Sequence, residues 1–254
     1  MSRALPADTM WLLPDWRDVP ANARALSTRR AGGVSVGDYA SFNLAHHVGD
    51  DPAAVAANRA ILRRAAGLPS EPLWLEQVHG VEVVEHTGAP PASVPRADAA
   101  VAFEPGRVCA VMTADCLPVV LVDRAGTRIG VAHAGWRGLV GGVLEATVAA
   151  LRCAPVDIVA WLGPAIAQPA FEVGVEVRDA FVQKHREHAS AFVANPGGRF
   201  QADLYELARQ TLARAGVVRV TGGGRCTSAE SDEFYSFRRD GGRTGRMATL
   251  AWLL

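Results

Sequence analysis

Residues 98–133, DAAVAFEPGRVCAVMTADCLPVVLVDRAGTRIGVAH, contain four short valine-rich segments in succession with no helical pattern between them. Runs of this kind favour β-strands, which we predict over residues 99–103, 108–112, 118–122 and 128–132. A strictly alternating βαβ chain would place a helix after each strand. The stretch therefore predicts an α+β domain in which helices flank a mixed β-sheet.

The sequence outside this stretch supplies the helices and further strands. A helix after the Asp51-Pro52 cap ends at Gly67, and another runs from the variant capping box at Asp203 to Gly216. Further helices are predicted over residues 137–152 and 175–188, and further strands over residues 82–85, 158–162, 217–220 and 248–252. No repeat divides the chain, and the proline-rich residues 88–95 are interpreted as a surface loop. We expect a single domain over residues 1–254.

Composition excludes several classes of protein. With 49% apolar and 20% charged residues among 254, the chain is globular, and its 26 basic and 26 acidic side chains provide no electrostatic case for binding nucleic acid or a membrane surface. No apolar run approaches the roughly 20 residues of a membrane span, and the N-terminus lacks a signal-peptide pattern. We expect a cytoplasmic protein, either a monomer or a small homo-oligomer. Its four cysteines are interpreted as thiols or metal ligands.

Three polar breaks in apolar segments are the candidate sites. Thr113-Ala-Asp-Cys116 interrupts two strands, and a buried Asp115 needs a partner there. His133 ends a strand just before Gly135-Trp-Arg137, where a helix N-terminus could bind an anion. His79 ends an apparent strand in WLEQVHG. Each has an ordinary alternative: a tight turn, a buried cysteine, or a histidine that is hydrogen-bonded within the core.

Taken together, His79, Cys116 and His133 are three soft or borderline ligands beside turns. A His₂Cys set with one open position suits catalytic zinc, although such long spacing is no local signature. His185 and His188, three residues apart, are predicted to be solvated. Seven histidines are too few for the full copper set of a multicopper oxidase, so one His₂Cys metal is the most this chain can build.

Six motifs resemble the successive blocks of one family: SFNLxxHVGDDPxxVxxNR, WLxQVHG, TADCxPV, VAHAGWRGL, GPAI…FEVG and FYSFRRDGxxTGR. This is the laccase-domain family, also called the polyphenol-oxidase or purine nucleoside phosphorylase family. The resemblance implies a single α+β domain, similar in fold to toxin deamidases of the cysteine-hydrolase type. It also implies a metal, Zn²⁺ with Cu²⁺ as the alternative, held by His79, Cys116 and His133, which would be the catalytic residues.

The resemblance implies phosphorolysis of adenosine, inosine and 5′-methylthioadenosine, with adenosine deamination as a companion activity. Arg137 and the Asn58-Arg59 pair could bind phosphate, and Asn43, Asp115, Arg238 and Arg239 are further candidates for contacting the substrate. Three alternatives stay open. They are a copper-dependent polyphenol oxidase, a metal-free hydrolase that edits peptidoglycan precursors with Cys116 as nucleophile and His133 as base, and a non-catalytic zinc module.

Overall fold

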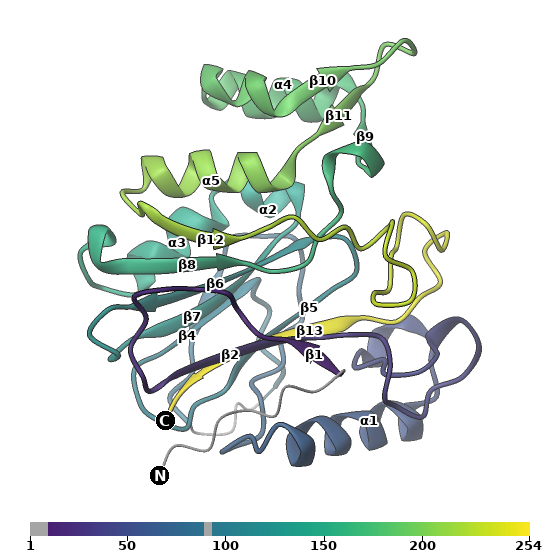
Figure 1. The fold of residues 1–254 in the computed structure, drawn as a ribbon, viewed down its shortest axis with the longest axis vertical. Coiled ribbons are helices and arrows are strands. Elements are labelled where there is room, and N and C mark those ends of the chain that lie inside the picture. Colours follow the sequence, from purple (N-terminus) through teal and green to yellow (C-terminus); the bar gives the residue numbers. More distant parts are fainter. Residues whose placement is uncertain (1–9, 89–92) are drawn as a thin grey trace.

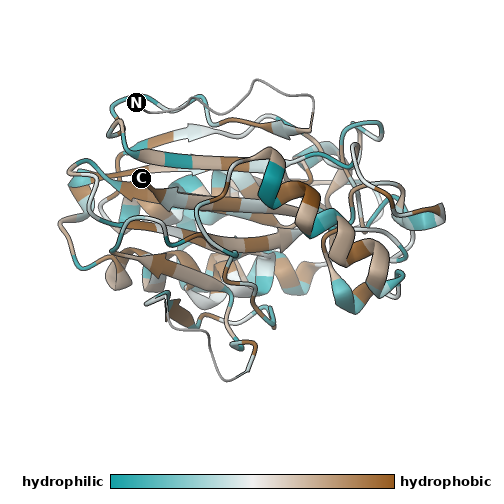
Figure 2. Ribbon diagram, turned by 90° about the horizontal axis from the view of Figure 1, so that it is seen from below, coloured by the Kyte–Doolittle hydropathy of each residue, from teal (hydrophilic) through white to brown (hydrophobic). Residues whose placement is uncertain are grey.

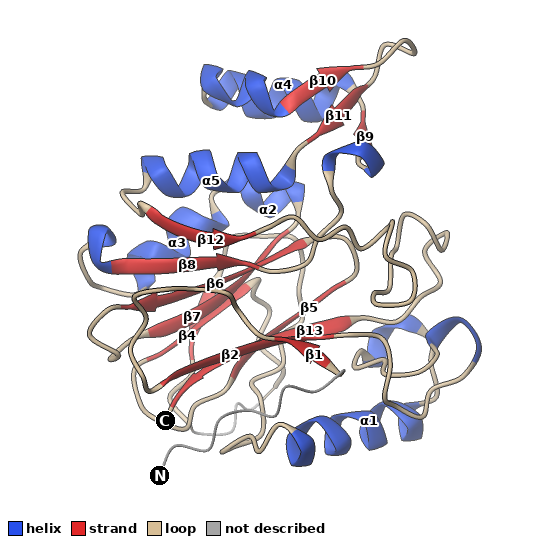
Figure 3. Ribbon diagram, viewed as in Figure 1, coloured by secondary structure: helices blue, strands red, loops and turns tan. Residues whose placement is uncertain are grey.

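Two β-sheets packed face to face form the centre of the protein, and helices cover both outer faces (Figure 1). The computed structural model describes residues 10–88 and 93–254. Figure 3 separates the two sheets from the helices that cover them. The α+β architecture with a mixed sheet is therefore confirmed.

The larger sheet has six strands in the order β12-β8-β6-β7-β4-β3. Three antiparallel pairings, β8 with β6, β6 with β7 and β7 with β4, lie between two parallel ones at the edges. In chain order the strands are β3 (Val83–Glu85), β4 (Ala99–Ala102), β6 (Leu117–Asp123), β7 (Ile129–Ala134), β8 (Ile158–Leu162) and β12 (Arg219–Gly222).

The smaller sheet is antiparallel, in the order β1-β2-β13-β5. Its strands are β1 (Trp11–Leu12), β2 (Ala23–Thr28), β5 (Cys109–Thr113) and β13 (Met247–Leu253). The chain passes from the smaller sheet into the larger one between β5 and β6. The Thr113–Cys116 segment spans that passage, so the polar break in the sequence marks the change of sheet.

Alternating side chains of the buried strands fill two separate cores. In β6, Leu117, Val119 and Leu121 face the helices, whereas Val120 and Val122 pack between the two sheets. All of these side chains are fully buried. A strand buried on both faces needs apolar residues at every position, which explains the continuous apolar run, and Figure 2 shows such residues along the central strands.

Helices on both outer faces complete the layers. α1 (Pro52–Ala65) packs on the smaller sheet, while α3 (Val143–Ala150), α4 (Val175–Lys184) and α5 (Leu204–Arg214) belong to the core on the outer face of the larger sheet. The predicted caps are present. Asp51 accepts a hydrogen bond from the N–H of Ala53 at 2.9 Å, and Asp203 accepts one from the N–H of Glu206 at 3.0 Å.

Three expectations were wrong in detail. The helix predicted over residues 137–152 is two helices, α2 (Trp136–Gly141) and α3, because Gly142 between them adopts a φ of 111°. The helix predicted over residues 175–188 ends at Lys184. His188 is buried rather than solvated, with its ring Nδ1 2.7 Å from Oε1 of Gln210 and a T-shaped contact with the ring of Phe181.

The sequence patterns did not predict β1, β2 or the small sheet of β9 (Glu172–Val173), β10 (Phe192–Ala194) and β11 (Phe200–Ala202). The predicted loop over residues 88–95 falls partly on residues 89–92, which lie outside the described residues. Across the described part of the chain, every helix is too short or too polar to cross a bilayer.

Candidate metal and substrate site

His79, Cys116 and His133 meet where three segments come together. Cys116 directly precedes β6, and His133 lies near the end of β7, opposite Pro118 in the β6–β7 pairing. His79 is in a turn with a φ of 58° rather than at the end of a strand. The structure thus brings together the three residues selected from the sequence, which we call the trio.

The geometry of the trio fits a metal ion. The ligand atoms all lie within 4.8 Å of one another, and Sγ of Cys116 is 3.9 Å from Nε2 of His79. Zn–S and Zn–N bonds at tetrahedral angles would place such atoms about 3.5 Å apart, so a small contraction would close the site. A Cβ atom at Gly135 would lie 3.0 Å from Sγ of Cys116 and 2.9 Å from Cδ2 of His79. Glycine at this position therefore leaves room for the ligands.

Asp98 orients two members of the trio, and it was not predicted from the sequence. Its buried carboxylate lies 2.8 Å from Nδ1 of His133 and accepts hydrogen bonds from the N–H groups of Val78, His79 and Gly80 at 3.1, 3.0 and 2.7 Å. Burial alone would raise the pKa of Asp98, but the bonds from His133 and Gly80 lower it. The ionised carboxylate fixes the QVHG turn and leaves Nε2 of His133 for a metal.

Cys116 and His133 are electrostatically coupled. Burial raises the pKa of the Cys116 thiol, but the charge of His133 and hydrogen bonds from both histidines outweigh that effect and lower it. The pKa of His133 is raised, since the thiolate and Asp98 outweigh its burial. The thiolate form that a metal ligand or a nucleophile requires is therefore favoured.

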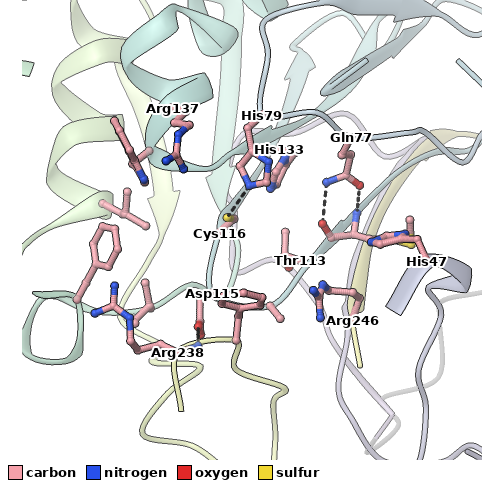
Figure 4. Close-up of a pocket in the computed structure, with 17 residues that line it drawn as sticks. His47, Gln77, His79, Thr113, Asp115, Cys116, His133, Arg137, Arg238 and Arg246 are labelled. Atoms are coloured by element: carbon pink, nitrogen blue, oxygen red, sulfur yellow. Dashed lines mark hydrogen bonds between the residues drawn. The ribbon is translucent and has the colours of Figure 1, made fainter. Parts of the chain in front are cut away.

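The trio lies in a cavity of about 360 Å³, a size found for small-molecule sites (Figure 4). Among the predicted contacts, Asp115, Arg137 and Arg238 line it. Arg137 is exposed, with its guanidinium 4.4 Å from the ring of Trp136. The remaining lining residues are His47, Gln77, Met112, Thr113, Ala114, Trp136, Ile166, Phe171, Leu204, Phe237 and Arg246.

Asp115 has the partners that its burial requires. Its carboxylate accepts hydrogen bonds from Thr227 Oγ1 at 2.6 Å, Ser236 Oγ at 3.0 Å and the N–H of Arg238 at 2.6 Å. Asp115 itself has a φ of 86°. With three donors engaged, this carboxylate attaches the C-terminal loop to the turn that contains Cys116.

Asn43 and Arg59, which the sequence suggested as substrate contacts, lie apart from the trio. Asn43 is fully buried, and its amide bonds Ala45, Asp50 and the N–H of Arg246. Arg59 donates from Nε to Leu44 O at 2.9 Å and lines a different cavity, with its guanidinium 3.9 Å from the ring of Trp74. These two side chains organise the residue 41–59 segment instead.

Asn58 and Arg239 are committed to the fold in the same way. Asn58 is fully buried and bonds Val34, Ser35, Ser41 and Asn43. The guanidinium of Arg239 bonds Asp240 and the carbonyls of Thr227, Ser228 and Phe234.

Reasoning from single residues also missed the aromatic and cationic walls of the cavity. Phe171, Phe237 and Arg246 line it from segments far apart in sequence. Their signal was present, because each falls within a motif quoted above, in FEVG, FYSFRRDG and TGR respectively. Nothing in the composition of those motifs distinguishes a cavity wall from ordinary packing.

Comparisons with known proteins agree with this architecture. Residues 24–254 match the family model described as multi-copper polyphenol oxidoreductase laccase. The chain is 56% identical over 245 residues to a purine nucleoside phosphorylase of Pseudomonas aeruginosa, covering 96% of this chain and 98% of that protein. It is 52% identical over 243 residues to the purine nucleoside phosphorylase YfiH of Escherichia coli, with coverages of 96% and 98%.

Solved structures show the same fold. A Neisseria meningitidis protein superposes with a TM-score of 0.92 at 52% identity, covering 96% of this chain and 99% of that one. The Bacillus licheniformis hypothetical protein YfiH gives a TM-score of 0.91 at 28% identity, with 98% of both chains covered. The agreement of sequence and fold over nearly the whole length places this chain in the multi-copper polyphenol oxidoreductase laccase family.

Proposed function

We propose that the protein cleaves purine nucleosides with phosphate in the cavity that holds the trio. The observation that carries the proposal is the combination, in one cavity of about 360 Å³, of potential metal ligands, guanidinium groups and aromatic rings. The names of the relatives support it. The expected substrates are adenosine, inosine and 5′-methylthioadenosine, and the products are the free base and ribose 1-phosphate or methylthioribose 1-phosphate.

Phosphorolysis requires a site for phosphate and a site for the purine, and side chains of the cavity can provide both. An oxygen of phosphate forms a bond to C1′ of the sugar as the bond from C1′ to the purine nitrogen breaks, and the purine leaves with the electron pair and takes up a proton. Phosphate requires positive charge, for which Arg137 lines the cavity. A purine requires apolar surface, which the rings of Trp136, Phe171 and Phe237 offer.

Zinc is the metal we propose for the trio, with copper as the alternative. His79 would bind through Nε2, Cys116 through Sγ and His133 through Nε2, since Asp98 engages Nδ1. Three protein ligands and an open position are typical of catalytic zinc, which supplies a Lewis acid when bound. Adenosine deamination, in which water replaces the amino group at C6, is proposed as a companion activity of the same cavity.

One observation favours a second candidate, a metal-free cysteine hydrolase. Asp98, His133 and Cys116 form a chain in which a carboxylate orients an imidazole and the imidazole faces a thiol of lowered pKa. This order of groups is the one that activates nucleophilic cysteines. An amidase acting on peptidoglycan precursors would use it.

Metal analysis of the purified protein, paired with release of adenine from adenosine with and without phosphate, tests the proposal. We expect about one zinc per chain and release that requires phosphate. Full activity in the metal-free protein, lost on alkylation of Cys116, would favour the hydrolase instead. The cavity would then be the same, but the chemistry would belong to the thiolate.

A further inference from the structure

Arg246 is the half-buried arginine of the cavity lining, whereas Arg137 and Arg238 are exposed. It precedes β13, and its Nη1 donates to Thr244 O at 2.8 Å and to Gly245 O at 3.0 Å. Within the described chain, Nε and Nη2 make no hydrogen bond, and no carboxylate lies within 4.0 Å of the guanidinium. Nε–H and Nη2–H lie on the same side of the group, and together they form the fork that matches two oxygens of an oxyanion.

This guanidinium is also partly desolvated. Arg246 is half-buried, and burial lowers its pKa, with partial compensation from the negative charges of Cys116 and Asp115. The Asp115 carboxylate is already bonded to Thr227, Ser236 and Arg238. A cation removed from water without a carboxylate partner costs free energy that a bound anion can offset. A neutral sugar or purine would offset little of it.

The position of Arg246 is fixed before any ligand arrives. Its backbone N–H donates to Oδ1 of the fully buried Asn43 at 2.9 Å, and the ring of Phe237 lies 5.7 Å from its guanidinium. Arg137 is exposed, and Arg238 is exposed with its Nη1 donating to Glu172 O. Of these three arginines, which all line the cavity, Arg246 is the one that is half-buried, and a side chain already restricted by its surroundings loses less entropy on binding.

A second observation points to a ligand beside Arg246. The hydroxyl of Thr113 is buried and has no hydrogen-bond partner in the described chain. Thr113 pairs with Met247 across β5 and β13, so it neighbours Arg246, and it lines the same cavity. In the view of Figure 4, Thr113 lies between the trio and Arg246. Thr113 thus places a hydroxyl without a partner among the described residues in the wall of the cavity that Arg246 also lines.

We propose that the free fork of Arg246, together with the hydroxyl of Thr113, binds the phosphate that attacks the nucleoside. The proposal rests on the proposed phosphorolysis and names its phosphate subsite. The shared chemistry is that of an oxyanion, so the carboxylate of an amide substrate could use the same fork. Phosphate is favoured because a group of higher charge makes better use of a desolvated guanidinium.

The test compares Arg246→Lys, Thr113→Val and the control Arg243→Lys. Lysine keeps the charge but loses the fork, and valine removes the hydroxyl with little change of shape. Arg243 is exposed, pairs with Asp38 at 3.7 Å and lies outside the cavity. Steady-state rates at saturating inosine give KM for phosphate, and rates at saturating phosphate give KM for inosine. Thermal unfolding with inorganic phosphate reports binding without catalysis.

We expect Arg246→Lys to raise KM for phosphate about tenfold or more, Thr113→Val to raise it about threefold to tenfold, and neither to change KM for inosine much. Phosphate should raise Tm of the wild-type and Arg243→Lys proteins but not of Arg246→Lys. An unchanged phosphate KM in both cavity variants would overturn the proposal. A loss of phosphate affinity in Arg137→Lys alone would also overturn it, because phosphate would then bind at the exposed Arg137.

The outcome also separates this inference from the proposed function. If the wild-type protein cleaves no nucleoside, phosphorolysis is wrong, but the Tm shift with phosphate still decides whether Arg246 binds it. The other outcome is that phosphate leaves the Tm of the wild type unchanged while Arg246→Lys weakens only the binding of an amide substrate that carries a carboxylate. In that case the fork binds that carboxylate, and the phosphate proposal fails. If Arg246→Lys does not fold, Thr113→Val gives the same comparison.

Discussion

Oδ1 of Asp98 lies 2.8 Å from Nδ1 of His133 and accepts a hydrogen bond from the backbone N–H of His79 at 3.0 Å. One carboxylate oxygen thus positions two of the three candidate metal ligands. It sets the tautomer of one histidine and the backbone turn of the other. The trio depends on a residue that contributes no ligand itself.

Asp98→Asn should weaken the trio without removing a ligand. The amide keeps the size of the side chain but turns one acceptor into a donor that faces N–H groups. We expect metal affinity to fall about 10- to 100-fold, with a lower Tm. Competition with a zinc chelator measures the affinity, and Asp157→Asn, an exposed carboxylate paired with Arg124 at 3.7 Å, is the matched control. Equal affinities in the two variants would contradict the role of Asp98.

Removal of a ligand should have a larger effect. Cys116→Ala and His79→Ala should each lose most of the metal, because three protein ligands leave no redundancy. Elemental analysis of the purified variants measures this. Cys153→Ala, which changes a half-buried thiol outside the trio, should keep its metal. Stoichiometric zinc in Cys116→Ala would exclude the trio as the metal site.

Gly135→Ala tests the space between the ligands. Its Cβ would meet the Cys116 sulfur at 3.0 Å and the ring of His79 at 2.9 Å, so one of them must move. We expect reduced metal content and activity with a smaller change in Tm. Gly197→Ala is the control, since the nearest atom to its Cβ is 3.6 Å away. Full metal content in Gly135→Ala would show that the ligands do not need the position they have here.

The reactivity of Cys116 in metal-free protein should depend on pH in a specific direction. An ordinary thiol loses reactivity as pH falls below about 8.5. The pKa of Cys116 is lowered, so its thiolate should persist well below that pH, whereas burial raises the pKa of Cys153. Iodoacetamide labelling followed by peptide mass analysis should therefore modify Cys116 faster than Cys153 at pH 7. Bound metal should protect Cys116, and equal rates with and without metal would argue against ligation.

Arg137→Lys should affect phosphate less than Arg246→Lys does. Arg137 is exposed, so its charge is screened by water and salt, and its ordering costs entropy. We expect a rise of about twofold to fivefold in KM for phosphate, unchanged zinc and little effect on deamination, which uses water. An equal loss of both activities would instead place Arg137 in the nucleoside pocket or the fold.

Much of the architecture followed from local patterns. The continuous apolar run of β6 and the caps at Asp51 and Asp203 depend on neighbours along the chain, so they could be predicted. The strands β1 and β2 could not, because β2 pairs with β13 from the opposite end of the chain and β1 is held in the sheet by β2. The break at Gly142 was missed because the apolar spacing continues across it.

The candidate site shows the same division. The motifs identified the trio, because each ligand lies beside a turn in one of the quoted motifs. The structure then brings the three residues together. Asn43 was predicted to contact the substrate, but its amide makes hydrogen bonds to Ala45, Asp50 and the backbone N–H of Arg246. The sequence did not single out Arg246 or Asp98, because their roles depend on the hydrogen-bonding groups that surround them in the folded protein.

The ratio of ribose 1-phosphate formed to purine released is the most direct measurement of the proposed phosphorolysis. Wild-type protein of known metal content would be given inosine with phosphate, and both products would be quantified over time. We expect one ribose 1-phosphate for each hypoxanthine and almost no release when phosphate is omitted. Release at the same rate without phosphate, yielding free ribose, or no release in the presence of stoichiometric zinc would contradict it.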